Sequence, residues 1–545
     1  MNFWGVSVTD GAYILAYDVG TTGIKTCLYY IHSSIELIAS AGHGYALNVL
    51  PNGGAEQNPD DWWEAMRVTT KQIITQSGIA PESIAGLSFC SQMQGLVLVD
   101  ENGTPVRPAM SYMDQRAAKE LKEGLSYGLT IDGFNVVKLI RSLVITKAAA
   151  GSVKDTVWKY KWVENNEPEN FKKVRWWLDV KEYLIHRCCG EFVMTADSAF
   201  STMLYDIRSG HECFSRTMCD MMGVNYEHLP RLIKSTDSAG GLTAVAAREL
   251  GLKANTPVFG GGGDATLIGI GAGAVGLHST HIYSGTSGWV STVVDKPKVD
   301  VSAKIGSVVG ANPGYYNYFA ELETAGKCLE WVKDHLALDE IGIYLEKKHV
   351  SDSQEAMYKS LYDYMMHVVS QIPAGSNGVI FTPWLHGNRC PFEDSQARGM
   401  FINIGLDTGK TQLIRSVLEG VCYHMRWMLE AQEKKTKTSD TIRFVGGGAL
   451  SPVTCQILSD ILNRKVETVE NPQNVGAVGA AITVAVGLGL IDSFDEASKL
   501  IKPNCSYLPQ SAHRALYDTG FALYKNLYKD NKRNFAARSA IMSCI

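Results

Sequence analysis

Two short turns rich in glycine and threonine occupy matching places in the two halves of the chain, and they constrain its fold more than any other feature. The same 265-residue offset separates Gly20 from Gly285 and Thr21 from Thr286. In each half, an apolar run with β-branched and aromatic residues enters the turn and a second one leaves it. This pattern is typical of two strands joined by a turn. The sequence therefore predicts a duplicated strand–turn–strand unit.

The two turns, Asp18–Gly23 and Ser284–Gly288, also suit phosphate binding. Glycine lets backbone N–H groups crowd around an anion, and threonine and serine hydroxyls add further donors. Either turn alone fits an ordinary hairpin equally well, but two turns in equivalent positions favour a nucleotide held between two half-chains. The residues predicted to meet that nucleotide are Thr21, Thr22 and Lys25 from the first half and Gly285, Thr286 and Ser287 from the second.

Length and charge narrow the class of protein. A chain of 545 residues is too long for one hydrophobic core and fits two domains. We predict the boundary at the most glycine-dense segment, Pro257–Asp264, which gives domains of residues 1–258 and 259–545. The net charge is −5, and no long block of one charge sign occurs. A small-molecule partner is therefore expected, and a nucleic-acid partner is not.

Cysteine usage and apolar runs bear on the compartment. The 12 cysteines lack metal or redox spacing, which favours buried free thiols in the reducing cytoplasm. The N-terminal Met1–Trp4 has no basic region followed by an apolar core, so secretion is not expected. The longest uncharged run, Val475–Ile491, is short for a membrane span and contains four glycines. It is interpreted as a tightly packed internal helix.

Phosphoryl transfer needs a proton acceptor and a divalent metal beside the phosphates, and two aspartates suit these roles. Asp264 follows four glycines, which let a substrate approach closely, and it begins a predicted helix. Asp18 stands at the edge of the first turn, where carboxylate oxygens can hold Mg²⁺, and Asp264 is the second metal candidate. The alternatives are a helix N-cap for Asp264 and a turn-capping carboxylate for Asp18.

Two further groups of residues offer binding surfaces. A glycine turn after a predicted strand presents backbone suited to adenine or ribose, although taken alone it fits a plain tight turn better. Its residues are Gly446, Gly447, Gly448 and Ala449. Polar side chains on loops of the first half suit a sugar, because binding residues concentrate on loops, although they also fit ordinary surface residues. They are Gln92, Gln94, Asp114 and Arg116.

Together these motifs resemble the FGGY carbohydrate kinases, and the similarity extends in order over almost the whole chain. Besides the two turns it includes Gln92–Gly95, Lys159–Asn166, the glycine loop ending at Asp264, Gly387–Pro391, Gly399–Glu419, Gly446–Ala449 and Gly476–Ala481. The resemblance implies an α/β fold of two ribonuclease-H-like, actin-like ATPase domains with a deep cleft between them that holds ATP. It also implies that Asp264 accepts the proton and that Thr286 and the Gly446 turn contact the nucleotide.

Within the family the chain is most similar to the xylulokinases. This similarity implies a cytoplasmic enzyme that uses ATP and Mg²⁺ to phosphorylate the primary hydroxyl of a ketopentose. The expected substrate is D-xylulose, phosphorylated at O5 to D-xylulose 5-phosphate, with Met93, Gln94 and Asp114 in contact with the sugar. A membrane partner is not expected. A homodimer stays open because the family often forms dimers.

Three departures from the xylulokinase pattern keep other substrates open. Gln94 stands where histidine is usual, Tyr112-Met113-Asp114 replaces Trp-Asn-Asp, and Asn388 replaces a glutamate. An amide presents a different donor and acceptor pattern to a sugar hydroxyl than imidazole does. Ribulose, another ketose, a sugar acid or a polyol such as erythritol are therefore alternatives. Outside the enzymes, an actin-like ATP-dependent switch protein or a weakly catalytic sugar sensor is the alternative, because a fold does not fix function.

Overall fold

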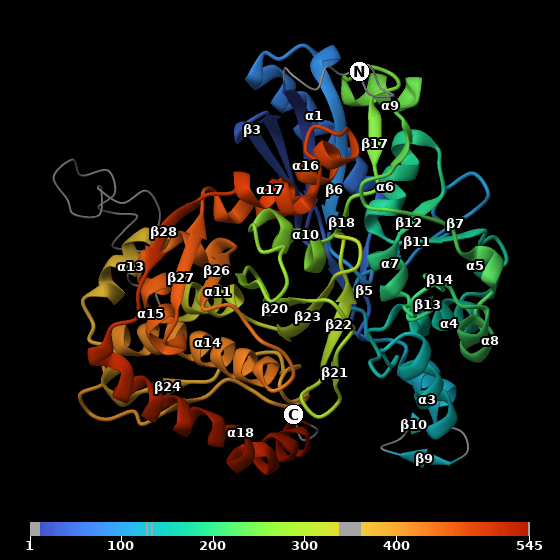
Figure 1. The fold of residues 1–545 in the computed structure, drawn as a ribbon. Helices are drawn as coiled ribbons and strands as arrows, with labels where there is room; N and C mark the ends of the chain where they lie inside the picture. The colour runs from blue at the N-terminus through green and yellow to red at the C-terminus, as the bar shows by residue number, and fades with distance from the viewer. Residues whose placement is uncertain (1–10, 127–128, 132–133, 337–360, 543–545) are drawn as a thin grey trace.

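Two mixed β-sheets form the framework of the computed structural model, which describes residues 11–126, 129–131, 134–336 and 361–542. The first sheet has the order β16-β17-β6-β1-β2-β3, and β18 pairs with β6 beside β17. Its strands are β1 Ala12–Val19, β2 Gly23–Ile31, β3 Ile35–Gly44, β6 Ile84–Ser91, β16 Ser238–Gly241, β17 Pro257–Phe259 and β18 Gly262–Gly263. In Figure 1 it stands at the top, in blue and green.

The second sheet has the order β21-β22-β23-β20-β19-β26-β27-β28. Its strands are β19 Thr280–Ser284, β20 Gly288–Val294, β21 Val299–Asp300, β22 Ile305–Val309, β23 Tyr316–Leu322, β26 Thr441–Val445, β27 Lys465–Val469 and β28 Pro503–Tyr507. Short strands outside the two sheets are β4 Asn48–Val49, β5 Ala55–Gln57, β7 Val97–Val99, β8 Ala109–Met110, β9 Thr130–Ile131, β10 Phe134–Asn135, β11 Trp176–Leu178, β12 Val193–Thr195, β13 Tyr205–Asp206, β14 Cys213–Phe214, β15 Arg231–Ile233, β24 Ile380–Phe381 and β25 Phe401–Ile402.

The two sheets repeat one arrangement, as the paired turns predict. In the first, β1, β2 and β3 are antiparallel neighbours, and β6 and then β17 run parallel to β1. In the second, β19, β20 and β23 are antiparallel neighbours, and β26 and then β27 run parallel to β19. Each glycine turn joins the first two strands of its sheet. This shared order confirms the predicted duplication and the two-domain, actin-like α/β fold.

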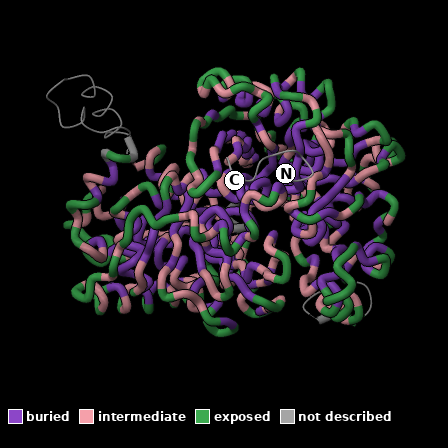
Figure 2. The backbone as a smooth tube through the Cα atoms, turned by 45° about the horizontal axis from the view of Figure 1, so that its top comes forward, coloured by how far each residue is buried: buried purple, intermediate pink, exposed green. Residues whose placement is uncertain are grey.

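Helices cover the sheets and carry much of the core. They are α1 Pro59–Ser77, α2 Ala118–Leu125, α3 Val136–Ile145, α4 Thr156–Asn166, α5 Pro168–Phe171, α6 Val180–Cys189, α7 Ala196–Ser201, α8 Arg216–Met222, α9 Ala244–Leu250, α10 Asp264–Gly271, α11 Gly326–His335, α13 Leu361–Ser370, α14 Lys410–Glu433, α15 Pro452–Leu462, α16 Val475–Gly487, α17 Phe494–Leu500 and α18 Arg514–Met542. The first helix begins as its sequence predicts, because the Asn58 side chain accepts from Asp60 N and Pro59 takes the first position. Figure 2 shows the buried residues running through the interior of both halves.

One late helix returns to the first half of the molecule. The α16 helix, predicted as a tightly packed internal helix, packs on β1 and β6 of the first sheet and on α10 (Figure 1). Its alanines share one apolar cluster with Ile14 and Phe259, and Thr483 Oγ1 lies 3.3 Å from Ser88 Oγ. An added Cβ at Gly479 would lie 2.2 Å from Leu267 O, so glycine permits the close crossing of α16 and α10. The halves therefore pack directly together.

The position of the division between halves follows from the sheets. β17 spans the predicted boundary between residues 258 and 259, and β18 still pairs with β6. The second sheet begins at β19, so the change from one sheet to the other lies after α10 and before residue 280.

Other sequence expectations have mixed outcomes. Trp62 and Trp63 are core residues. The expectation of uniformly buried thiols is wrong for Cys213 and Cys505, which are exposed on short strands. Met1–Trp4 lies outside the described residues. Within the described part of the chain, no helix has the length and apolarity needed to cross a membrane.

Candidate active site

A cavity of about 900 Å³ opens between the two sheets. Parallel strands bring their carboxyl ends to one edge of a sheet, where α/β proteins place their ligands. Here the segments after β1, β6 and β18 face the turn between β19 and β20 across the cavity. The lining includes ten of the predicted residues: Asp18, Thr21, Thr22, Lys25, Gln92, Met93, Gln94, Asp264, Thr286 and Ser287. Residues predicted from distant parts of the sequence thus meet at one site.

The first turn is held by bonds to its backbone. Gly20 N donates to Gly23 O at 2.9 Å, and the Gln57 side chain donates to Thr21 O at 2.7 Å. Lys25 Nζ donates to Gln473 O at 2.6 Å, a residue that follows β27 of the second sheet. The side chains of Thr21 and Thr22 line the cavity. This turn therefore presents hydroxyls and a lysine to the space between the sheets.

The second turn is braced from the side of α11. Gly285 N donates to Ser287 O at 3.0 Å, while Gly326 N and Ala325 N donate to the carbonyl oxygens of Gly285 and Thr286. The bonds fix the turn, and Thr286 itself is exposed. With its carbonyls bonded to α11, the turn offers its hydroxyls to an anion.

The Gly446–Ala449 turn lies directly beside the second turn. Gly446 has a φ of 90°, and an added Cβ there would lie 2.6 Å from Ser284 O. Gly448 is equally close to Ser284, since its added Cβ would lie 2.8 Å from Ser284 Oγ. The turn is not part of the lining of the 900 Å³ cavity. Its role in contacting nucleotide stays a prediction.

Asp18 is the second-last residue of β1 and lies opposite Lys25 in the hairpin register. Burial raises the pKa of its carboxyl above the ordinary value, and the charge of Lys25 acts in the opposite direction. The first turn of α16 approaches Asp18 so closely that an added Cβ at Gly476 would lie 2.8 Å from Asp18 Oδ2. The positive end of a helix thus faces this carboxylate.

Asp264 is the first residue of α10 and faces the same cavity. Its Oδ1 accepts from Ala265 N at 2.8 Å, while Gly263 takes the N-cap position. Burial, together with the negative charges of Asp18 and Glu321, raises the pKa of Asp264 to about 7. A carboxyl group with this pKa can exchange a proton near neutral pH, which suits a general base.

Met93 and Gln94 form the loop after β6 that reaches the cavity. Gln94 adopts a φ of 62°, a left-handed conformation that is rare for a side chain of this size. Its carbonyl oxygen accepts from Lys159 Nζ at 2.6 Å, which holds the loop in place. Met93 packs on the glycine loop, because an added Cβ at Gly263 would lie 2.2 Å from Met93 Sδ. The loop after β6 thus contacts the loop that carries Asp264.

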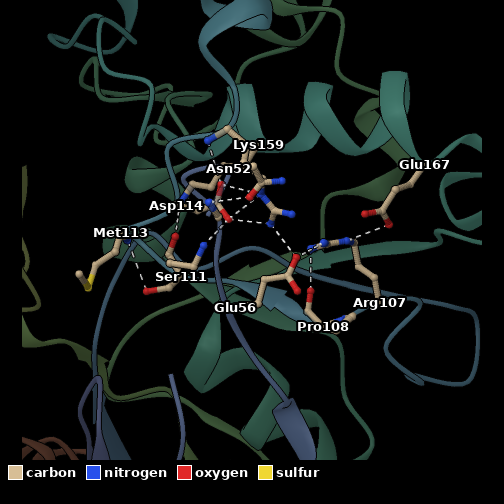
Figure 3. A network of polar contacts seen from close by, with 12 residues as sticks. Asn52, Glu56, Arg107, Pro108, Ser111, Met113, Asp114, Lys159 and Glu167 are labelled. Carbon is tan, nitrogen blue, oxygen red and sulfur yellow. Dashed lines mark hydrogen bonds and ion pairs between the residues drawn. The ribbon is translucent and has the colours of Figure 1, made fainter. Parts of the chain in front are cut away.

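Asp114 is placed differently from the other predicted sugar residues. It is fully buried and does not line the cavity. Its Oδ2 accepts from Ala55 N at 2.9 Å and from Arg116 Nη2 at 2.6 Å, and Arg116 also pairs with Glu56 (Figure 3). These bonds stabilise the segment that follows β8. The structure shows a supporting position for Asp114, and a direct sugar contact stays a prediction.

Several further cavity residues were not predicted as site residues, although Tyr112 and Arg389 lie in segments compared with the family motifs. Tyr112 lies between the first turn and the second half, with its hydroxyl 3.5 Å from Thr21 Oγ1. Arg389 pairs with Glu321 at 3.0 Å, and Asp155 also lines the cavity. Burial raises the pKa of Asp155 to about 6. These residues come from separate loops and strands, so only the fold brings them together.

The carboxylates fit a magnesium ion. Among the described residues, no three His, Cys, Asp or Glu side chains gather into a metal site of their own. Mg²⁺ in phosphate-binding sites is held by one or two carboxylates, with substrate phosphates and water as its other ligands. Asp18 and Asp264 both line the cavity and can serve as those carboxylates. The donor set is therefore that of an ion that arrives with a nucleotide.

Two equivalent sheets, each with a glycine turn at one shared cavity, and a carboxylate there whose pKa is raised define the actin-like ATPase fold and supply groups suited to phosphoryl transfer. Family models identify it further. The model of the FGGY family of carbohydrate kinases, N-terminal domain, matches residues 13–271, and that of the C-terminal domain matches residues 281–488. The chain belongs to the FGGY family of carbohydrate kinases.

Individual relatives agree on the fold and differ in the substrate they are named for. A xylulose kinase of Bacillus subtilis (strain 168) is 28% identical over 523 residues, which covers 95% of this chain and 97% of that protein. A gluconokinase of the same strain is 26% identical over 521 residues and 95% of each chain. The crystal structure of gluconate kinase from Lactobacillus acidophilus has a TM-score of 0.82 at 24% identity, covering 97% of this chain and 99% of its own. The chain is therefore a sugar kinase that uses ATP.

Proposed function

We propose that this protein transfers the γ-phosphoryl group of ATP to the primary hydroxyl of a ketopentose, D-xylulose, and releases D-xylulose 5-phosphate. The observation that carries the proposal is Asp264, whose pKa is raised to about 7 in a cavity that also contains both glycine turns. The xylulose kinases among its relatives support the choice of sugar. A cytoplasmic location and a homodimer belong to the same proposal, and a mass measurement in solution tests the dimer.

The residues of the cavity divide the reaction among them. Asp264 accepts the proton of the sugar hydroxyl while the hydroxyl oxygen attacks the γ-phosphorus of ATP. The bond between the γ-phosphorus and the oxygen that bridges it to the β-phosphate breaks, and ADP leaves. Thr21, Thr22 and Lys25 meet the transferring group from one side, and Thr286 and Ser287 meet the nucleotide phosphates from the other. Mg²⁺, held by Asp18 and Asp264, would neutralise phosphate charge. Met93 and Gln94 hold the sugar.

Electrostatics favour a neutral sugar over a sugar acid. Asp18 and Glu321 both raise the pKa of Asp264, which means that the potential around the proton acceptor is negative. The one arginine that lines the cavity within the described residues, Arg389, already pairs with Glu321 at 3.0 Å. A substrate carboxylate placed beside Asp264 and Glu321 would therefore meet like charges, although the lining elsewhere also includes Lys25, Lys147 and Lys304. A ketose offers only hydroxyl and carbonyl groups and avoids this repulsion.

A substrate panel tests the proposal. The full chain is assayed with ATP and Mg²⁺ by coupled ADP release, using D-xylulose, D-ribulose, D-gluconate, erythritol and no sugar. We expect kcat/KM to be highest for D-xylulose and lowest for D-gluconate. A preference for gluconate would overturn the argument from charge. ATP turnover that is unaffected by every sugar would instead favour an actin-like switch protein.

Substitution of Asp264 tests the chemistry. Asp264→Asn is expected to lower kcat by roughly 10²- to 10⁴-fold, the range of general-base catalysis, while sugar binding is largely kept. The matched control is Asp100→Asn, because the Asp100 carboxylate accepts from Asn102 N and Thr104 N in the turn after β7 and does not line the cavity. If Asp264→Asn turned over sugar as fast as this control, Asp264 would not be the proton acceptor.

A further inference from the structure

The loop that carries Asp264 has no side chains of its own to hold it. Residues 260 to 263 are all glycine, so their position depends on bonds to the backbone. Gly260 N donates to Asp237 O at 3.0 Å, and Gly261 N donates to Ser235 O at 2.9 Å. The last N–H before Asp264, that of Gly263, is bound differently. It donates to a side-chain carboxylate, Asp197 Oδ2, at 2.7 Å.

Most hydrogen bonds of the Asp197 carboxylate go to the loop that carries Asp264 and to the first turn of α10. It is 2% exposed on α7, and its Oδ2 also lies 2.8 Å from Thr266 Oγ1 in the first turn of α10. Gly263 and Thr266 stand on either side of Asp264 in the sequence. One charged oxygen thus binds both flanks of Asp264, and bonds to a charged acceptor are about twice as strong as neutral ones.

A series of hydrogen-bonded, buried side chains holds the other oxygen of the Asp197 carboxylate. Its Oδ1 accepts a short bond from Thr195 Oγ1. Thr195 in turn accepts from Lys181 Nζ at 2.7 Å, and Lys181 pairs with Glu182 and donates to Ser198 Oγ at 2.9 Å. All of these side chains are buried. Hydrogen bonds that follow one another in a low-dielectric interior strengthen each other, so this series gives Asp197 one defined position.

A second carboxylate on the neighbouring helix serves the sugar loop in the same way. Asp179, at the start of α6, accepts from Gly95 N at 2.9 Å and from Val180 N at 2.8 Å. Gly95 follows Met93 and Gln94 directly. Asp179 and Asp197 therefore each hold one of the two loops that contact each other in the cavity, and they provide a comparison between sugar binding and catalysis.

We propose that Asp197 is a positioning residue for the phosphoryl transfer: through Gly263 N and Thr266 Oγ1 it orients the first turn of α10 so that the Asp264 carboxylate faces the acceptor hydroxyl. The inference rests on the proposed role of Asp264. It assigns to Asp197 an effect on the catalytic step and not on substrate affinity, because none of its bonds reaches a residue predicted to contact sugar or nucleotide.

Steady-state kinetics of the full chain with D-xylulose and ATP separate these effects. Asp197→Ala removes both acceptor oxygens and is expected to lower kcat by about 100-fold, as a misplaced reacting group does, with each KM changed by less than about threefold. Asp197→Asn keeps one acceptor for Gly263 N and is expected to recover about a tenth of the wild-type kcat. Asp179→Asn is expected to raise the sugar KM instead.

Two further variants test whether the effect of Asp197→Ala comes from a general loss of folding. Thr266→Val keeps the side-chain volume, removes one of the two donors to Asp197 Oδ2 and is expected to lower kcat by about threefold to tenfold. Thr202→Val keeps the side-chain volume at the C-cap of α7 and removes a hydroxyl that donates to Ala199 O at 2.6 Å. Thr202 belongs neither to the series of buried side chains that holds Asp197 nor to the cavity lining, so this variant is expected to keep kcat. Asp197→Ala with wild-type kcat, or with kcat and both KM values all impaired together, would overturn the positioning role. Turnover that survives Asp264→Asn would instead refute the proposed function itself.

Discussion

Gly261 and Gly263, in the loop that carries Asp264, face different neighbours, and substitution is expected to separate their effects. Gly261 has a φ of 62°, and an added Cβ would lie 2.2 Å from the backbone oxygen Phe89 O. The backbone cannot move aside, so Gly261→Ala is expected to lower the free energy of unfolding by about 1–3 kcal/mol or more. At Gly263 the added Cβ meets the flexible thioether of Met93. Gly263→Ala is therefore expected to fold and to raise the sugar KM by roughly tenfold, because Met93 shifts.

Thermal unfolding and sugar kinetics of the two variants check this difference. The informative result is the contrast between them: a loss of stability for Gly261→Ala and a loss of sugar affinity for Gly263→Ala. Equal unfolding temperatures for both variants and the wild type would contradict the role assigned to the positive φ of Gly261.

Single residues also show where sequence reasoning reaches its limit. Asp18, Thr286 and Asp264 could be predicted because each stands in a local glycine pattern with a chemical meaning. Asp114 has no such pattern, and its spacing from Arg116 is equally compatible with a sugar site and with the buried ion pair that forms. Asp197 stands in no recognisable local pattern either, because its partners Gly263 and Thr266 are more than 60 residues away in the sequence.

At the scale of elements, α14 contains a buried histidine that links three parts of the second half. His424 Nε2 donates to Cys390 O at 2.7 Å, and Nδ1 accepts from Tyr524 Oη of α18 at 2.8 Å. Burial lowers the pKa of His424 to about 4. Because this folded-state value lies below the unfolded value of 6.5, His424 stays neutral in the fold. Its full contribution to stability is present above pH 6.5 and is lost as the pH falls towards 4.

Chemical denaturation between pH 7.5 and 4.0 checks this effect. The wild type is expected to lose stability on acidification more steeply than His424→Gln, with a difference approaching about 3 kcal/mol near pH 4. A glutamine at this position can keep a donor for Cys390 O and has no proton to gain in this range. Parallel pH dependences for the two proteins would show that His424 is not held neutral in the fold.

The elements themselves were largely predictable, and their partners were not. Both hairpins, the capped helix α1 and the glycine-rich helix α16 follow from local periodicity and capping residues. That α16 packs mainly on β1 and β6, while its first residue Val475 joins Val445 and Val469 of the second sheet, depends on contacts such as that of Thr483 with Ser88, 395 residues apart. Local patterns carry no information on such pairing.

At the scale of the whole molecule, the return of α16 makes the first half depend on the second. One face of the first sheet buries Ile14, Ala16 and Phe259 against the alanines of α16. A fragment of residues 1–274 contains the complete first sheet and α10 but leaves this face in water. The free energy from apolar burial would be missing there. We therefore expect the fragment to lack a cooperative unfolding transition and to bind a hydrophobic dye.

Complementation provides the decisive comparison. Mixing the fragment with residues 275–545, which carry α16, is expected to restore a cooperative transition and ADP-releasing activity with D-xylulose, because the helix can then cover the sheet and bring Gly476 to Asp18. The control is the same mixture with Gly479→Leu, whose side chain would meet Leu267 O, 2.2 Å from the added Cβ, and block the crossing of α16 and α10. A cooperative transition in the isolated fragment would mean that the first domain folds without α16. The actin-like halves would then be independent units joined only at the cleft. Any movement of the two halves towards each other around ATP would then depend on the two glycine turns alone.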